Sequence, residues 1–184
     1  MRHEGFPGQI CSVARSLEIV GEWWTLLVVR EAFFGTERFS DFEAKLGIAK
    51  NVLTERLNKL VDSGVLERRP LPGRGNPVSY RLTAKGRDLL PVIIALMQWG
   101  DRWINRGQEP VRVLDRETGK EVAQIAVTTP KGKFLSARDL AVVPGPGANG
   151  AIRARFRRPG RSQNGPSAKS SRARSMSARS GTAD

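Results

Sequence analysis

The sequence predicts a mainly α-helical fold with a small β component, and three observations lead to that class. Between residues 10 and 106, apolar side chains recur every three or four positions in successive segments, as in helices with one buried face. Two short segments, 65–69 and 78–82, alternate as a pair of strands does. The loop between them is rich in proline and glycine, so residues 39–82 predict a winged helix-turn-helix.

Length and composition set the expected organisation of the chain. With 184 residues, of which 39% are hydrophobic, the chain can build one domain of about 100–150 residues with appendages. We expect four parts: an N-terminal arm (1–9), a winged helix-turn-helix DNA-binding and dimerisation domain (10–107), a small β-rich extension (108–147) and a disordered basic tail (148–184).

The charge is strongly basic and unevenly distributed. A formal net charge of +13 and a pI of about 11.1 favour polyanions such as nucleic acid as partners. Residues 150–184 contain nine Lys or Arg and one acidic residue, so +8 of the net charge lies there and +5 in residues 1–149. The expected folded part is therefore only mildly basic.

Several classes of protein are disfavoured by what the sequence contains. A single cysteine, Cys11, and a single histidine, His3, provide neither a disulfide framework nor a metal cluster nor an anchored catalytic pair. We therefore expect no enzyme, no cofactor and no metal. No apolar run approaches the roughly 18 residues of a membrane span, and the first ten residues lack the apolar core of a signal peptide. The expected location is the cytoplasm, in association with the nucleoid.

The first two helices are expected to form the support of the domain. A stripe of apolar residues predicts a helix from about Ile10 to Val20, closed by Gly21. Residues 22–34 are too apolar to be half exposed, so they predict the helix around which the domain packs. Of its two tryptophans, Trp24 is assigned to the core, whereas the position of Trp23 stays open.

The two helices of the predicted motif follow. Ser40 and Glu43 have the spacing of a capping box that would begin the first helix, and Gly47 would end it. The second helix is expected over residues 50–63, with an apolar side facing inward. That side consists of Leu53, Leu57, Leu60 and Val61.

The opposite side of this second helix is polar, as in a recognition helix that enters a major groove. The alternative is an ordinary amphipathic helix with a solvated face. It is disfavoured because all five parts of the motif, two helices, two strands and the loop between the strands, occur in order. The loop between the strands is the expected wing, with Arg68, Arg69 and Arg74 at its base and tip. The candidate DNA-binding residues are Lys50, Asn51, Thr54, Asn58, Lys59, Arg69 and Arg74.

A long helix is expected from Thr83, its cap, to about Arg106, with Pro91 either kinking it or following an interrupted first part. Its apolar stripe is longer than a small core can cover, which favours a homodimer. The alternative is that the helix folds back on its own domain. The candidate dimer-interface residues are Ile10, Leu96, Trp99 and Trp103.

Residues 111–143 change to short strand-like segments separated by turns, with a capped single turn at 136–140. They contain no titrating cluster and no obvious pocket. The following residues are mainly Arg, Ser, Gly, Ala and Pro, which cannot repay the entropy of ordering.

With these residues in view, the chain from Cys11 to Trp103 resembles the HxlR-type winged helix-turn-helix regulators, relatives of the MarR-like repressors. Single members of the matching set are common, but the whole set in this order and spacing is specific. The matching segments are 11–14, 21–27, 30–31, 38–40, 52–57, 64–68, 78–86 and 99–100.

The resemblance implies a homodimer that binds a short inverted repeat at a promoter, often in bacteria, and represses or activates a nearby gene. It also implies that a cysteine at the position of Cys11 can sense electrophiles or oxidants. The helix dipole and Arg15 would favour its thiolate, although a buried packing role is an open alternative. Some relatives carry a cysteine pair suited to zinc in the extension, but here residues 128–132 contain none, so no zinc is expected.

The expected function is therefore that of a DNA-binding transcriptional regulator, with double-stranded DNA and a second copy of the chain as partners. A small-molecule or electrophile effector and action as a repressor are part of this expectation. The alternative is a winged-helix module that mediates protein–protein contacts and uses its tail for a polyanion. The arginines of the wing argue against that alternative.

Overall fold

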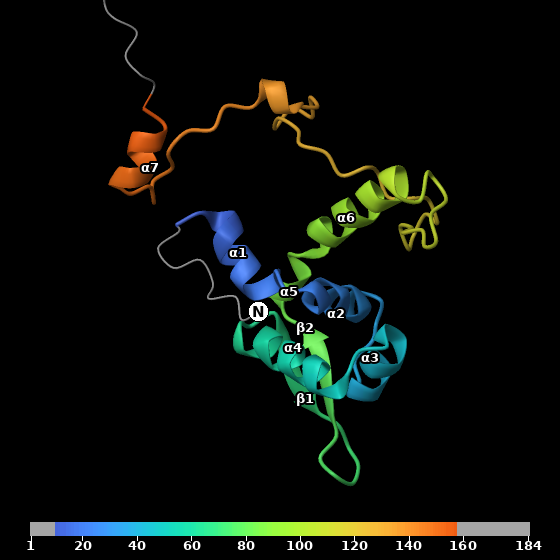
Figure 1. Cartoon of the computed structure of the whole chain (residues 1–184). Coiled ribbons are helices and arrows are strands. Elements are labelled where there is room, and N and C mark those ends of the chain that lie inside the picture. The colour runs from blue at the N-terminus through green and yellow to red at the C-terminus, as the bar shows by residue number, and fades with distance from the viewer. Residues whose placement is uncertain (1–9, 158–184) are drawn as a thin grey trace, which may run out of the picture. The chain divides into compact units, whose positions relative to one another are not determined.

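The computed structural model describes residues 10–157, so the expected N-terminal arm and the tail beyond residue 157 lie outside the described residues. The chain divides into two compact units, residues 1–141 and 142–184. Figure 1 labels the elements of both. In the described part of the chain, no helix is long and apolar enough to cross a membrane.

Three helices and a two-stranded sheet form the core of the first unit. α2 (Trp23–Phe33) packs against α3 (Phe39–Leu46), α4 (Lys50–Asp62) and the sheet of β1 (Leu66–Pro70) and β2 (Val78–Leu82). This order of elements confirms the mainly helical winged helix-turn-helix fold. The residues of the core with no exposed side-chain surface come from three helices and are Val28, Val29, Phe42, Leu53, Leu57 and Leu60.

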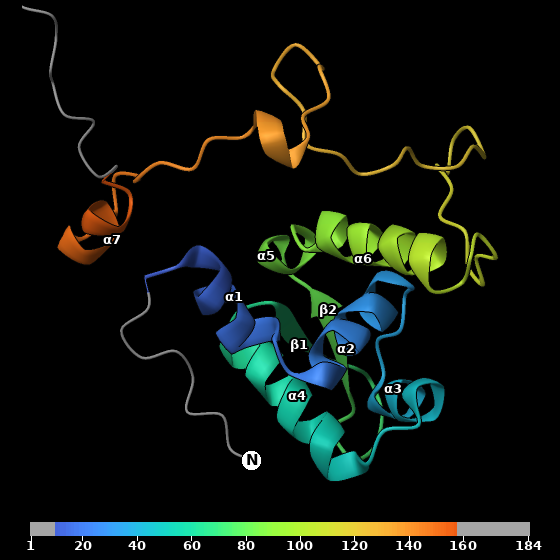
Figure 2. The same ribbon diagram turned by 45° about the horizontal axis from the view of Figure 1, so that its top comes forward.

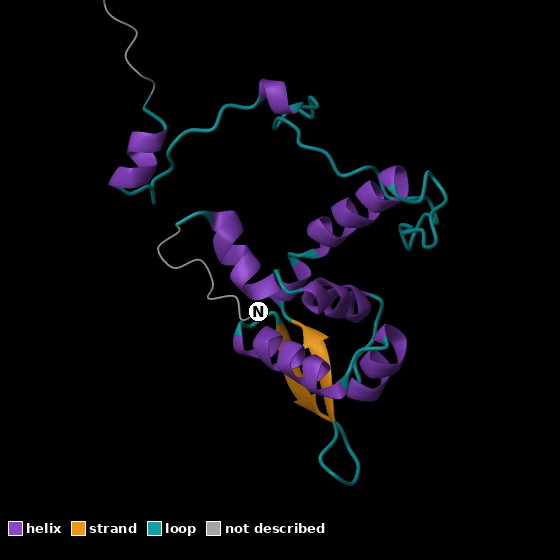
Figure 3. Ribbon diagram, in the orientation of Figure 1, coloured by secondary structure: helices purple, strands orange, loops and turns teal. Residues whose placement is uncertain are grey.

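Figure 3 shows that β1 and β2 are the strands of the described residues. They pair antiparallel from Leu66 opposite Leu82 to Pro70 opposite Val78. Pro70 was expected to end the strand, but it remains paired. Leu71 donates to the carbonyl of Pro77 at 2.8 Å, so the next pair, Pro70 with Val78, is a non-hydrogen-bonded one. A missing N–H therefore costs nothing there.

The expected short edge strand before α3 is present as a single bridge between Arg38 and Ser79. This bridge explains why the capping box at Ser40 is wrong. Because Arg38 is extended in the bridge, it becomes the N-cap and the helix begins at Phe39 without a side-chain cap. The Ser40 hydroxyl instead lies 3.2 Å from a carboxylate oxygen of Asp41.

The first helix differs in detail from expectation, and the structure also shows where the two tryptophans lie. α1 (Ser12–Val20) begins two residues later than predicted, so Ile10 and Cys11 precede it. Ala14 and Val20 are its buried side chains, whereas Val13 and Leu17 are exposed. Trp23, whose position was open, is 92% exposed, and Trp24 packs against the core as assigned.

The long helix expected after the wing is interrupted. α5 (Ala84–Arg87) is capped by Thr83, whose hydroxyl oxygen accepts the Gly86 N–H at 3.1 Å, as predicted. α6 (Leu90–Trp103) follows with Pro91 in its first turn, where a missing N–H is tolerated. α6 ends before Arg106, which has a positive φ of 53°. Figure 2 shows α6 lying across α2, with which it is in contact.

Residues 108–141 do not form the expected strands. Their β pairing consists of two isolated bridges, Leu114 with Glu121 and Thr128 with Phe134. The capped turn is present, because Ser136 and Asp139 form a reciprocal capping box on η1 (Ala137–Asp139). Both hydrogen bonds from Ser136 hold the pKa of the Asp139 carboxyl below its usual value. In the second unit, α7 (Gly150–Arg155) is a short helix in a stretch that was expected to be disordered.

Candidate nucleic-acid interface

The position of α4 is fixed by the turn that precedes it and by its buried side. Gly47 ends α3 in the left-handed region with φ of 61°, which favours glycine, and Ile48 is buried in the turn. Leu53 and Leu57 are fully buried on the core side of the helix. In the first two turns of α4, the side chains exposed to solvent are those of Lys50, Asn51, Thr54 and Glu55.

Two polar residues on this exposed face differ in their available hydrogen-bonding groups. Asn51 is exposed, and its amide makes no side-chain hydrogen bond to any of residues 10–157. The Thr54 hydroxyl donates to the Lys50 carbonyl at 2.7 Å, so its oxygen remains as an acceptor and its methyl group stays exposed. The amide of Asn51 is the more versatile of the two groups.

A contact between the helix and the sheet involves a residue that the sequence did not single out as a site. The Arg68 guanidinium on β1 donates to the side-chain oxygen of Asn58 on α4. Arg68 also lies 5.8 Å from the ring centre of Tyr80, its partner across the two strands. Alternation along the strand puts Arg68 on the same face as the buried Leu66, toward α4, and this pattern was the available signal for the contact.

The wing comprises residues 71–77 and extends beyond the two strands (Figure 1). Gly73, Gly75 and Asn76 all have positive φ angles, which allow the tight path of the loop. Arg74 is exposed in this loop, whereas Arg69 at its base is held 2.6 Å from Glu67. The two arginines of the prediction therefore lie on one hairpin but differ in their pairing.

Ion pairs around α4 are mostly exposed and weak. Lys50 lies 3.9 Å from Glu43, and its ammonium group can exchange this contact for a phosphate at little cost. Arg56 is different, because its side chain is only 12% exposed and lies 3.4 Å from Glu22 at the start of α2. Arg56 therefore holds α4 to α2 and is not available for an external partner.

The structure brings Lys50, Asn51, Thr54, Asn58 and Lys59 together on α4, with Arg69 and Arg74 on the adjacent hairpin. The candidate dimer residues lie elsewhere. Leu96, Trp99 and Trp103 on α6 are 49%, 58% and 63% exposed, and Ile10 is 39% exposed before α1. Cys11 is exposed at the N-cap of α1, and both its proposed sensing role and the packing alternative stay predictions.

Comparisons with known proteins agree with this geometry. The profile of the HxlR-like helix-turn-helix family matches residues 19–108. An HTH-type transcriptional regulator of Mycobacterium tuberculosis is 42% identical over 143 residues, which cover 77% of this chain and 89% of the relative. An HTH-type regulator of Synechocystis is 34% identical over 100 residues, 54% of this chain and 74% of that protein.

Two solved structures extend the agreement to the fold. A proposed transcription factor, PA1607, matches with a TM-score of 0.69 and 40% identity over 75% of this chain and 97% of its own. Another from Pseudomonas aeruginosa, PA1374, matches with a TM-score of 0.57 and 39% identity over 79% of this chain and 100% of its own. These relatives are described as transcription regulators rather than enzymes. The chain belongs to the HxlR-like helix-turn-helix family and is a DNA-binding transcriptional regulator.

Proposed function

We propose that the protein binds a short inverted repeat as a homodimer, with α4 of each copy in a major groove and the wing on the flanking backbone or minor groove. The observation that carries this proposal is the exposed polar face of α4, set above the buried Leu53, Leu57 and Leu60. Such a helix has a fixed orientation and a hydrogen-bonding surface, which are the two requirements of groove reading. A dimer bound at a promoter would exclude polymerase, so repression is the proposed outcome.

The donors and acceptors of this face suggest different tasks for its residues. Asn51 has both its amide oxygen and its amide nitrogen available, which suits bidentate recognition of adenine. Thr54 offers an acceptor and a methyl group, because its hydroxyl proton is used by Lys50. The Asn58 oxygen accepts from Arg68, so its amide nitrogen is the group left to meet a base acceptor or a phosphate.

Basic side chains around this face would neutralise phosphates. Lys50 and Lys59 lie on α4, and Arg69 and Arg74 on the hairpin, so they would contact the backbone on either side of the inserted helix. Each such contact strengthens binding to all sequences alike and makes it depend on salt. Specificity would then come from α4 and affinity largely from these cations.

The proposed dimer rests on the exposed stripe of α6. Leu96, Trp99 and Trp103 form an apolar surface that the described part of the same chain leaves uncovered. Two copies joined there would carry two α4 helices, whose half-sites would lie about one helical turn of DNA apart.

The experiment begins with selection of genomic fragments by the purified full chain, which identifies the operator. Asn51→Ala and Thr54→Ala should each then lose ~1–3 kcal/mol of operator binding and relax preference at one position of each half-site. The matched control is Arg74→Ala, which should weaken operator and random DNA alike and lower the salt slope by about one. If both α4 variants kept full affinity and an unchanged site preference, α4 would not be the reading helix.

A further inference from the structure

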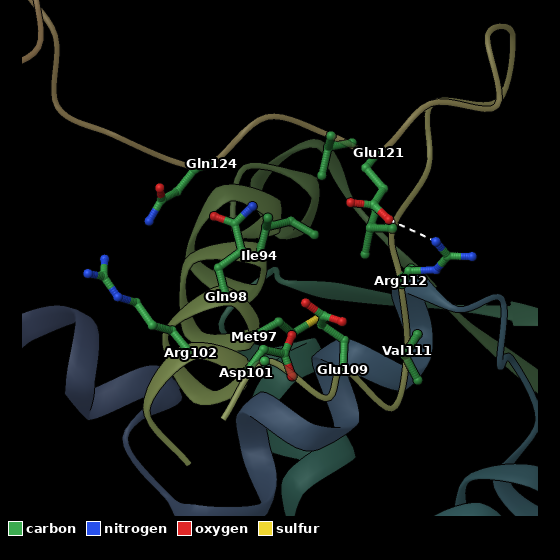
Figure 4. Close-up of a pocket in the computed structure, with 13 residues that line it drawn as sticks. Ile94, Met97, Gln98, Asp101, Arg102, Glu109, Val111, Arg112, Glu121 and Gln124 are labelled. Carbon is green, nitrogen blue, oxygen red and sulfur yellow. Dashed lines mark hydrogen bonds and ion pairs between the residues drawn. The ribbon is translucent and has the colours of Figure 1, made fainter. Parts of the chain in front are cut away.

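A pocket of about 390 Å³ lies between α6 and the residues that follow it (Figure 4). Its volume is in the range of small-molecule sites. One wall consists of the α6 residues Ile94, Met97, Gln98, Asp101 and Arg102, and the other comes from residues 107–124. Neither the groove reading nor the dimer surface proposed above uses this pocket.

The second wall is held in place by hydrogen bonds to α6 and within itself. The Gln98 amide nitrogen donates to the Ala123 carbonyl at 3.1 Å, and its oxygen accepts the Ile125 N–H at 2.8 Å. Val122 also donates its N–H to the Val113 carbonyl at 3.1 Å. Because Gln98 uses both ends of its amide for this purpose, it acts as a clamp that closes one side of the pocket.

The pocket combines an apolar surface with carboxylates. Ile94, Met97, Val111, Val113 and Val122 line it with aliphatic and thioether groups. Figure 4 shows Asp101 and Glu109 projecting into the same space as Met97. This arrangement provides a place for an apolar body with a polar group at one end.

The charges of the lining do not balance. Arg112 and Glu121 neutralise each other at 2.9 Å. Asp101 accepts one hydrogen bond from Asn105 at 2.9 Å, and within residues 10–157 neither Asp101 nor Glu109 lies in an ion pair. The remaining lining cation, Arg102, lies 4.9 Å from the ring centre of Trp103. Two carboxylates thus outnumber one guanidinium that is already in contact with an aromatic ring.

We propose that this pocket binds a small organic cation with an apolar body. Its ammonium group meets Asp101 and Glu109, where charge-assisted hydrogen bonds form, and its body covers Met97 and Val122. An anion of the same shape would face two carboxylates and is rejected. Because α6 also carries Leu96, Trp99 and Trp103, a bound ligand contacts the same helix as the proposed dimer surface.

The test uses titration calorimetry of the full chain with three probes that share one body: 4-phenylbutylamine, 4-phenylbutanol and 4-phenylbutyrate. The amine is expected to bind, the alcohol more weakly, and the carboxylate not at all. Glu109→Gln and Asp101→Asn should each weaken amine binding about tenfold, since each removes one charged partner. Neither should lower the melting temperature, which verifies that the fold is kept.

The matched control is Glu117→Gln, a carboxylate on the same segment that does not line the pocket and should bind the amine as wild type does. Absence of amine binding by the wild-type chain would overturn the proposal. So would equal binding of the carboxylate probe, or an equal loss in all three variants. Because the assay contains no DNA, a failure here is separate from any failure of groove reading.

Discussion

α4 and α6 have the same apolar periodicity, but the apolar stripe of α4 is buried in the single chain and most of that of α6 is exposed. In α4 the stripe of Leu53, Leu57 and Leu60 is fully buried against α2 and the sheet. In α6 only Ile93 and Ile94 are buried, whereas Leu96, Trp99 and Trp103 are about half exposed or more. Both patterns specify a helix, but only the apolar stripe of α4 is buried by other elements in the described part of the chain. The difference indicates that periodicity determines which face of a helix is apolar, but not which other element or chain buries that face.

The largest expected effect is on the free energy of unfolding, which should respond differently to substitutions in α4 and in α6. Leu57→Ala should lower the free energy of unfolding by ~2–5 kcal/mol, because it leaves a cavity in a close-packed core. Leu96→Ala removes the same atoms from a site that is 49% exposed and should cost much less in dilute solution. Urea denaturation at low protein concentration measures both. Equal losses would mean that α6 is covered by its own chain.

The exposed apolar stripe of α6 is expected to be buried by a second copy of the chain. Leu96→Asp would place a charge in the proposed dimer surface, where its desolvation opposes association, so the variant should be monomeric. Sedimentation at micromolar concentration gives the oligomeric state, and operator binding should fall with it. Val127→Asp is the control, since Val127 is an apolar residue outside α6 that is 56% exposed, against 49% for Leu96. If the wild-type chain were a monomer and still bound its operator with full affinity, the proposed dimer would be wrong.

The smallest expected effect concerns α1, the other helix assigned to the dimer. Cys11 is exposed at the N-cap of α1, so a reagent in solution can reach its sulfur. We expect a quinone or diamide to modify it and to change operator affinity modestly, by about 1 kcal/mol, within the usual range of coupling energies. Binding is compared for wild type and Cys11→Ser with and without reagent. An equal response of the serine variant would rule out Cys11 as the sensor.

The features of α4, α6 and their neighbours that the sequence predicted correctly are local ones. The apolar periods predicted both helices, and Gly47, with a positive φ, ends α3 as expected. The cap at Thr83 was also predicted correctly, because it depends on two residues only three positions apart. Features of this kind are local, so nearby residues contain the information.

What the sequence alone determined is therefore the order of helices and strands, the apolar face of each helix and the family of the chain. The tertiary structure decided the rest, because it depends on pairs that are distant in sequence. Pairing of Arg38 with Ser79 moved the start of α3 and removed the cap at Ser40. The contact of Arg68 with Asn58 determines which amide atom of the reading face remains available. The segment after α6 alternates like strands, but within residues 10–157 it pairs only in isolated bridges, and it lies against Gln98 to form a pocket that no local pattern revealed.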